Sequence, residues 1–271
     1  MTAQVEKIHL NPNEETLLIT LYTKARLTPP EILADTKATE LLERIDYDYA
    51  ALKVPTGTRL TVPLRAKRFD EYVREFLAAQ PEGTIIHLGC GLDTRIDRIR
   101  PAQADWYDLD LPEVIDLRRN FFVTTDRYHM IACDVTDLRW MDAITAPPQK
   151  ALVVAEGLFM YLAENQVKQV ILGLQEHFPG CHIAFDAFSQ AVIQRIHRHP
   201  SVKHTGATIC WGIDEAKAIE SWGEGIRLVE EWYFNQSPYI NHYSPGYRLM
   251  FKLSGLFPAA TKAHRLLYYT L

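Results

Sequence analysis

The chain has 271 residues, of which 47% are hydrophobic and 23% are charged, and its formal net charge is −5. This composition predicts a globular protein with enough apolar residues for a sizeable core. It argues against a nucleic-acid partner, because no basic stripe is dense enough to neutralise several phosphates. It also argues against a membrane span, because no apolar run approaches the roughly 18 residues that one needs.

The cellular compartment is suggested by the beginning of the chain and by its cysteines. The first ten residues lack the basic head and apolar body of a signal peptide. The four cysteines are widely spaced and form no Cys-x-x-Cys pair, which argues against a disulfide framework. We therefore expect a protein of the reducing cytoplasm. The cysteines are Cys90, Cys133, Cys181 and Cys210.

The first part of the chain is expected to form helices and turns. Apolar positions recur at helical spacing over Glu14–Arg26, and two prolines at 29 and 30 stop that helix. A second short helix is expected over Lys37–Ile45. A loop is predicted over Val54–Thr61, because Pro55 and Gly57 interrupt the pattern. A longer helix should then open at residue 63 or 64 and end at 76 or 77.

From residue 84 onward, short apolar runs alternate with helical stretches. This alternation predicts right-handed βαβ crossovers and a mostly parallel sheet. The expected helices are Thr94–Ile99, Pro112–Phe121, a short piece near Trp140, Glu164–Phe178, a stretch from Asp186 to His199, and Tyr247–Ala263. The expected strands are Thr84–Leu88, Asp105–Leu109, Tyr128–Cys133, Leu152–Ala155, His182–Asp186, Ile226–Phe234 and Leu266–Leu271.

The most informative segment is the turn after the first of these strands. Gly89 and Gly91 form a Gly-x-Gly turn, and Asp108 and Asp110 follow the next strand about twenty residues later. Open α/β sheets hold nucleosides in this way, with bare backbone under one part of the ligand and an acid on the ribose. The segment predicts a nucleoside cofactor.

Two cofactors compete for this turn. Dinucleotide-binding folds place a third glycine where this chain has Thr94, and Asp93 stands where a pyrophosphate would approach. A carboxylate there repels phosphates but suits a sulfonium and an ammonium. The turn therefore favours S-adenosylmethionine (SAM) over NAD, and a nicotinamide dehydrogenase remains the alternative.

Several motifs in order along the chain resemble the leucine carboxyl methyltransferase family, in its polyketide-type (tetracenomycin-like) O-methyltransferase branch. The resemblance spans most of the chain, and His87 departs from it at a position where relatives often carry asparagine. The motifs are Leu-Gly-Cys-Gly-Leu-Asp-Thr-Arg at 88–95, Trp-Tyr-Asp-Leu-Asp-Leu-Pro at 106–112, Ala-Glu-Gly-Leu-Phe-Met-Tyr-Leu at 155–162 and His-Phe-Pro-Gly at 177–180.

The resemblance implies a Rossmann-like class I SAM-dependent methyltransferase fold, with a seven-stranded, mostly parallel sheet and an antiparallel last strand. It implies one methyltransferase domain over 1–271. In that domain 1–62 form an N-terminal helical lid and 63–271 the SAM-binding core, with a substrate-covering insertion around 187–225. SAM is the implied donor and S-adenosylhomocysteine the product, with no metal.

The same resemblance assigns the cofactor-binding residues. The turn would lie against the methionine part, and Asp110 would bind the ribose hydroxyls, with Asp108 as the second candidate. Arg65 would pair with the SAM carboxylate, assisted by Lys24. The remaining roles are Gly89, Cys90 and Gly91 in the turn, Asp134 and Val135 at the adenine, and Glu156 near the amino group.

The acceptor is expected to be a small molecule with an oxygen nucleophile. A carboxylate is already ionised at neutral pH, whereas a phenol, with a pKa near 10, needs a base. No base follows from the motifs, so a carboxylate is favoured and a phenol or other hydroxyl is the alternative. Tyr161 and His242 are the candidate catalytic side chains. A non-catalytic SAM-binding protein also remains open, and the oligomeric state is not specified.

Two further features of the sequence concern the acceptor side. Aromatic residues could form the walls of an apolar pocket, and a run of histidines could suggest zinc, although its spacing matches no common site. The aromatic residues are Tyr22, Tyr161, Phe188 and Trp211, and the zinc candidates are His197, His199, His204 and Cys210.

Overall fold

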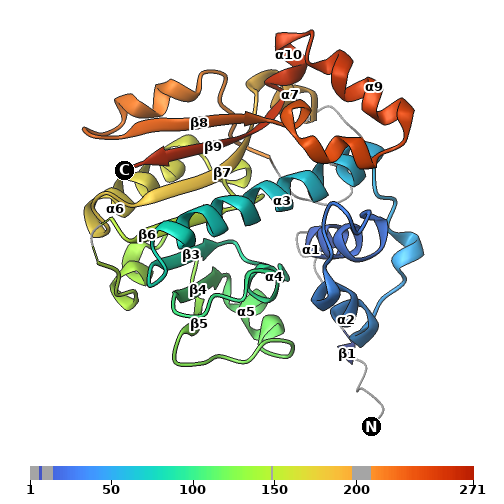
Figure 1. Cartoon of the computed structure of the whole chain (residues 1–271). Coiled ribbons are helices and arrows are strands. Elements are labelled where there is room, and N and C mark those ends of the chain that lie inside the picture. The colour runs from blue at the N-terminus through green and yellow to red at the C-terminus, as the bar shows by residue number, and fades with distance from the viewer. Residues whose placement is uncertain (1–5, 8–14, 148, 197–208) are drawn as a thin grey trace.

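A computed structural model describes residues 6–7, 15–147, 149–196 and 209–271 (Figure 1). Seven strands form one sheet in the order β5-β4-β3-β6-β7-β9-β8, and the first five in this order run parallel. Strand β9 lies antiparallel between β7 and β8. This confirms the expected seven-stranded sheet with an antiparallel final strand. The strands are β3 (Thr84–Leu88), β4 (Asp105–Asp110), β5 (Tyr128–Ala132), β6 (Ala151–Ala155), β7 (His182–Phe188), β8 (Arg227–Tyr233) and β9 (His264–Thr270).

Helices cover both faces of this sheet, and the N-terminal helices α1 and α2 lie together beside it (Figure 1). A separate two-residue pairing joins β1 (Glu6–Lys7) to β2 (Ile45–Asp46). The principal helices are α1 (Glu15–Tyr22), the π-type turn η1 (Thr23–Leu27), α2 (Thr36–Arg44), α3 (Thr56–Ala79), α4 (Arg95–Ile99), α5 (Pro112–Arg118), α6 (Glu164–His177), α7 (Gln190–Ile196), α9 (Pro245–Ser254) and α10 (Pro258–Thr261). Short 3₁₀ helices are η2 (Tyr49–Ala51), η3 (Leu138–Ala143), η4 (Phe159–Tyr161), η5 (Ala216–Ser221), η6 (Phe234–Gln236) and η7 (Pro238–His242).

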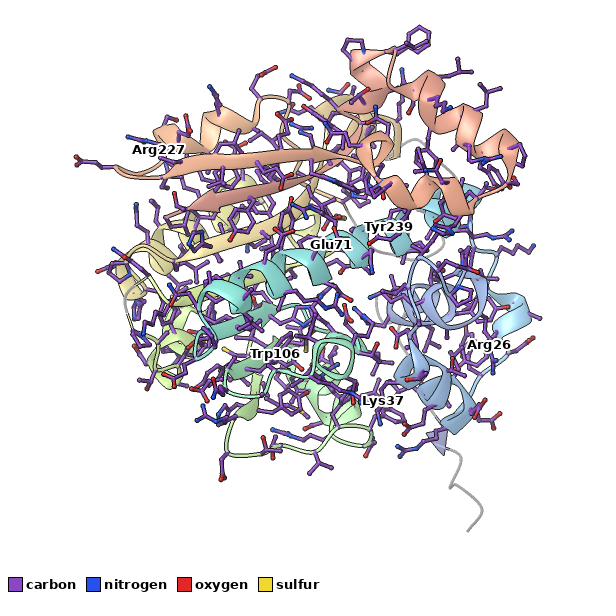
Figure 2. The ribbon with its side chains drawn as sticks, in the orientation of Figure 1. Arg26, Lys37, Glu71, Trp106, Arg227 and Tyr239 are labelled. Carbon is purple, nitrogen blue, oxygen red and sulfur yellow. The ribbon has the colours of Figure 1, made fainter. Side chains whose placement is uncertain are left out.

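The core consists of two apolar clusters, one on each face of the sheet. Successive side chains of a strand point to opposite faces, so Ile85 belongs to the cluster under α3 and Ile86 to the cluster under α6. Both are fully buried, as expected of parallel strands covered on both sides. Trp106, also fully buried, fills the first cluster from β4 (Figure 2).

The loop predicted over Val54–Thr61 is wrong, because α3 begins at Thr56. The missing amide of Pro63 removes the helical bond to Arg59, which normally disfavours helix. Tertiary packing compensates: Leu60 is buried, and its carbonyl accepts a hydrogen bond of 2.8 Å from the Tyr243 hydroxyl. The expected boundary between 62 and 63 therefore falls inside a continuous helix that joins the N-terminal region to the sheet.

Smaller differences at two strand ends matter for the site. Strand β9 begins at His264 rather than Leu266, and β7 continues to Phe188 rather than ending at Asp186. The two ends pair with each other, Phe188 opposite His264. This extension brings a histidine to the edge of the sheet where the carboxyl ends of the parallel strands meet. Glu14 and His197–His199, expected in helices, lie outside the described residues.

Replacing Phe185 by alanine should lower the free energy of unfolding by about 3–5 kcal/mol, because its fully buried ring packs on Phe159, Trp211 and Tyr269. Urea unfolding followed by tryptophan fluorescence measures the change. Val123→Ala, at an 82% exposed side chain, is the control and should change stability by less than about 0.5 kcal/mol. Equal effects of the two substitutions would contradict this packing.

Candidate active site

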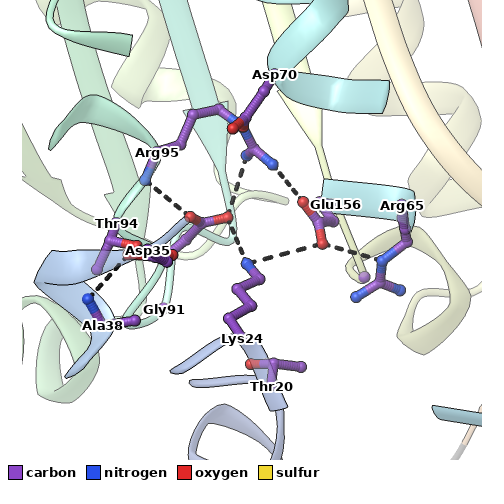
Figure 3. Close-up of polar contacts among 12 residues, drawn as sticks. Thr20, Lys24, Asp35, Ala38, Arg65, Asp70, Gly91, Thr94, Arg95 and Glu156 are labelled. Atoms are coloured by element: carbon purple, nitrogen blue, oxygen red, sulfur yellow. Dashed lines mark hydrogen bonds and ion pairs between the residues drawn. The ribbon is translucent and has the colours of Figure 1, made fainter. Parts of the chain in front are cut away.

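The candidate site lies where the parallel strands end. Gly89–Gly91 follow β3, Asp110 ends β4, Glu156 follows β6, and Asp186 lies near the end of β7. In open α/β sheets, ligands bind outside these carboxyl ends. The η1 turn carries Lys24 into the same cluster, so the N-terminal region contacts this edge (Figure 3).

The turn itself requires glycine at two positions. Gly89 and Gly91 have φ values of 63° and 49°, in the left-handed region where side chains are strained. Between them, the Cys90 amide donates to the Leu109 carbonyl at 3.1 Å, which ties the turn to β4. The Cys90 side chain is buried, so the turn presents backbone to a ligand.

Asp110 is the acid that faces this turn. Its Oδ2 accepts a hydrogen bond of 2.7 Å from the Gly91 amide, and its Oδ1 accepts one of 2.8 Å from the Leu111 amide. The side chain is partly exposed. Each carboxylate oxygen has a second lone pair, so Asp110 can still accept from a ligand hydroxyl. The pKa of this carboxyl lies above its ordinary value, because the effect of burial outweighs that of the two amide donors, which lower it.

Asp108, the second ribose candidate, is directed into the protein interior. It is fully buried, and both oxygens are occupied. Oδ1 accepts from the Trp106 indole at 2.8 Å and contacts His87 Nδ1 at 3.2 Å, while Oδ2 accepts from Arg118 at 2.5 Å and Tyr128 at 2.6 Å. Asp108 thus supports the turn from below and presents no oxygen to a ligand.

Arg118, on α5, is a site residue that the sequence did not reveal. Its Nη1 donates to the carbonyls of Gly91 and Asp93, at 3.0 and 2.7 Å, and it is fully buried. The guanidinium therefore holds the glycine turn to Asp108. No sequence signal marked it, because an arginine at the end of a helix is most often a solvated residue.

Lys24 joins the N-terminal region to the turn. Its ammonium lies 3.0 Å from Asp93 Oδ2 and 3.9 Å from Glu156 Oε1, and the lysine side chain is only 5% exposed. Asp93 also pairs with Arg95 and Arg98, at 3.2 and 3.1 Å. Burial raises the Asp93 pKa, but these cations lower it well below its ordinary value. Asp93 is therefore not the unpaired, phosphate-repelling carboxylate that the sequence suggested.

A second connection runs through the start of α2. The Asp35 side chain caps the helix by accepting from the Ala38 amide at 2.9 Å, and it also accepts from Thr94 and Arg98, at 2.6 and 2.7 Å. Thr94 occupies the place of the third glycine of dinucleotide-binding turns. Its buried hydroxyl is used to attach the N-terminal region to the core.

Glu156 lies at the centre of the cationic groups. Oε1 accepts from Arg65 Nε at 3.0 Å, and Oε2 pairs with Arg95 Nη2 (Figure 3). Arg65 in turn donates from Nη1 to Asp186 Oδ2 at 2.8 Å. The structure thus brings the predicted residues Lys24, Arg65 and Glu156 together.

Asp186 and His264 complete this cluster and were not predicted. The Gly157 amide donates to Asp186 Oδ1 at 2.6 Å, and His264 Nε2 lies 2.8 Å from Oδ2. Burial raises the pKa of Asp186, but Arg65 and His264 lower it further, to well below its ordinary value. Asp186 is therefore an acceptor, and His264 carries its proton on Nε2. Burial lowers the pKa of His264 more than Asp186 raises it.

The other predicted residues are more dispersed. Asp134 is exposed after β5 and accepts from the Thr136 amide at 2.8 Å, while the neighbouring Val135 is buried. Tyr161 is 37% exposed as a whole residue. The pKa of its hydroxyl is nevertheless raised, because the surrounding protein partly desolvates it. His242 is exposed on η7, and its ring stacks on Tyr239 with centroids 6.4 Å apart. Within the described chain, it forms no hydrogen bond or ion pair with the cluster around Glu156.

The expected aromatic walls are only partly present. Trp211 is 4% exposed and packs on Phe159, Phe185 and Trp222, so its assignment to an acceptor pocket is wrong and it belongs to the core. The reason is that its segment folds back on the sheet. Tyr22 and Phe188 remain partly exposed. Of the insertion 187–225, residues 197–208 lie outside the described residues, as do His197, His199 and His204.

The described residues contain neither a candidate metal site nor a membrane-spanning helix. No group of three or more histidine, cysteine or acidic side chains in this part of the chain could hold a metal ion. Within the same ranges, no helix is both long and apolar enough to cross a membrane.

The sequence is similar to those of known methyltransferases. Residues 18–175 match the leucine carboxyl methyltransferase family. A tetracenomycin polyketide synthesis O-methyltransferase from Streptomyces glaucescens is 37% identical over 98% of this chain and 99% of its own length. The chain belongs to the leucine carboxyl methyltransferase family. An S-adenosyl-L-methionine-dependent methyltransferase of Gibberella zeae is 28% identical, over 84% of each chain.

A solved structure shows the same fold. A DUF574 family protein from Streptomyces avermitilis superposes with a TM-score of 0.57 at 14% identity, covering 96% of this chain and 99% of that one. This member of the leucine carboxyl methyltransferase family is a class I SAM-dependent methyltransferase, as the sequence predicted, and not a nicotinamide dehydrogenase. The side chains at this edge are chemically compatible with SAM: the Asp110 carboxylate lies beside the glycine turn, and Lys24 and Arg65 supply buried cations.

The free energy of unfolding of this methyltransferase should fall in two stages as pH decreases. Below pH 6.5 the unfolded chain binds protons at His182 and His264, whose pKa values are lowered by burial in the folded state. Below about pH 4.5 the decline should steepen, because five buried carboxyls with lowered pKa values lose stabilising pairs as they are protonated. The pKa values of two others, Asp97 and Asp110, are raised and oppose this. The five are Asp70, Asp93, Asp108, Glu156 and Asp186.

Urea unfolding at pH 8, 6, 5, 4 and 3 measures this dependence. The His182→Asn variant is the internal control and should reduce the first stage while leaving the second, because burial alone shifts the pKa of His182. A free energy that stays constant from pH 5 to pH 3 would contradict the ion-pair network.

Proposed function

We propose that the protein transfers the methyl group of SAM to an oxygen of a small, polyketide-like molecule, with a carboxylate as the acceptor. The full-length similarity to the Streptomyces glaucescens O-methyltransferase supports an oxygen acceptor of this type. The observation that carries the cofactor assignment is the Asp110 carboxylate fixed on the Gly91 amide at 2.7 Å, where it can receive the ribose hydroxyls.

In this proposal, the cofactor residues act mainly by positioning. Arg65 and Lys24 would bind the cofactor carboxylate, Glu156 would lie near its ammonium, and Asp134 and Val135 would meet the adenine. SAM supplies an electrophilic methyl group that an oxygen attacks in line. Well-oriented reactants can recover on the order of 7–11 kcal/mol of such a barrier, and a closed, dry edge prevents water from solvating the opposite charges separately.

A carboxylate acceptor agrees with the side chains at this edge. It requires no proton removal, and the raised pKa of Tyr161 keeps its hydroxyl protonated at neutral pH, so Tyr161 is not available as a base. His242 is exposed and stacked on Tyr239, away from the cationic cluster. Neither candidate is therefore needed for chemistry.

A hydroxyl acceptor is the second candidate, and one observation favours it. His264 donates from Nε2 to Asp186, which leaves Nδ1 as an acceptor, and a carboxylate-oriented imidazole is the usual arrangement of a general base. Its lowered pKa keeps the ring neutral at pH 7, and the side chain is 15% exposed.

A panel of matched acceptors should separate the two. With naphthoic acids and the corresponding naphthols as probes, we expect transfer of radiolabelled methyl to the acids, with a rate that changes little between pH 7 and 9. Faster transfer to the naphthols, rising as their hydroxyls ionise, would favour the hydroxyl acceptor. SAM binding with no methyl release to any acceptor, including extracts of polyketide products, would instead support a non-catalytic SAM-binding protein.

Asp110→Ala should weaken SAM binding, because ribose hydroxyls would lose their acceptor at about 1–3 kcal/mol per unpaired group. Isothermal calorimetry measures the dissociation constant. Asp116→Ala is the control, since Asp116 is a 70% exposed carboxylate paired with Arg119. An unchanged dissociation constant for Asp110→Ala would remove this residue from the cofactor site.

A further inference from the structure

Asp186 has no role among the predicted site residues, yet its surroundings are unusually well defined. It is fully buried, and its two oxygens receive donors from three different elements. The donors are the Gly157 amide after β6 at 2.6 Å, Arg65 of α3 at 2.8 Å and His264 of β9 at 2.8 Å. A carboxylate held in this way cannot rotate, because each oxygen is fixed from a separate direction.

The fixed position of Asp186 determines the orientation of the Arg65 guanidinium. Its Nε is bound to Glu156 at 3.0 Å and its Nη1 to Asp186 at 2.8 Å. A guanidinium is planar, so two fixed nitrogens determine where the third one points. Asp186 and Glu156 therefore set the direction of Nη2.

The loop after β6 leaves room for that third nitrogen. A Cβ at residue 157 would lie 3.3 Å from Arg65 Nη2, closer than such contacts normally are. Gly157 also has a φ of 70°, which favours glycine. The absence of a side chain thus allows the guanidinium to lie against this backbone, beside the Glu156 carboxylate.

We propose that Asp186 is a positioning residue, which aims the Arg65 guanidinium at the cofactor's carboxylate and is itself held in place by His264 and the Gly157 amide. The inference rests on the proposed function, in which Arg65 binds that carboxylate. Asp186 does not touch the cofactor in this arrangement. It supports cofactor recognition through Arg65 alone.

The test uses two ligands that differ in one group. Decarboxylated SAM keeps the adenosine, sulfonium and ammonium of SAM and lacks the carboxylate that Arg65 would bind. The full-length Asp186→Asn variant keeps the shape of the side chain but removes its charge. We expect it to weaken SAM roughly 3- to 100-fold by calorimetry, while the affinity for decarboxylated SAM changes less than about twofold. A general loss of structure would weaken both ligands equally.

A double-mutant cycle assigns the effect to Arg65. In an Arg65→Ala background, Asp186→Asn should change SAM affinity less than twofold, because the group that it positions is gone. The matched control is Asp142→Asn. Asp142 is a carboxylate of a second histidine–aspartate pair, with His177 at 3.1 Å, on the exposed surface. It should leave both ligands unaffected.

The two binding measurements distinguish a failure of the Arg65 assignment from a failure of the Asp186 inference. If wild-type protein binds neither ligand, or binds both equally well, the assignment of Arg65 to the cofactor carboxylate fails and the inference fails with it. If wild type prefers SAM and Asp186→Asn preserves that preference, the inference alone is overturned. Should Asp186→Asn not fold, His264→Leu removes one anchor of Asp186 and must reduce the preference for SAM for the inference to stand.

Discussion

The structure depends on a buried carboxylate at the end of β6. Glu156 receives Lys24 from the N-terminal region, Arg65 from α3 and Arg95 from α4, so three separate parts of the chain meet at one side chain. Buried charges are costly unless they are paired, and removal of one partner leaves the others uncompensated. The geometry of the whole cofactor edge is therefore coupled, and no member of the cluster can be considered alone.

This coupling explains how the N-terminal helical region, which precedes the sheet in the sequence, becomes part of the site at the edge of the sheet. Lys24 lies in η1 and Asp35 caps α2, and their side chains form buried contacts with Asp93 and Thr94, shortly after the glycine turn. The long helix α3 strengthens the same connection, since it begins beside the N-terminal region and ends at the start of β3. The N-terminal region is thus attached to the core by buried ion pairs and also, through the chain itself, by α3.

The sequence was sufficient for the strands of the sheet, which leave periodic signals, and it marked the glycine turn and Asp110 by their local motif. Apolar runs marked the strands within two residues, and the turn with its following acid indicated the nucleoside site. Partners far apart in the sequence left no such signal. Arg118, Asp186 and His264 are ordinary residues in their local context, and only the fold brings them to the turn and to Arg65. The start of α3 was missed for a related reason, since distant contacts such as Tyr243 with Leu60 override the local effect of Pro63.

The placement of β9 between β7 and β8 also determines when the molecule can assemble during synthesis. Strand β8 leaves the ribosome before β9, yet it has no direct partner in β7 and pairs with the sheet only through β9. Until residues 264–270 emerge, β7 has an open edge and Asp186 lacks its imidazole partner. A nascent chain that has completed all five parallel strands therefore still has an unfinished cofactor edge, and this sheet closes only after translation has passed its inserted strand.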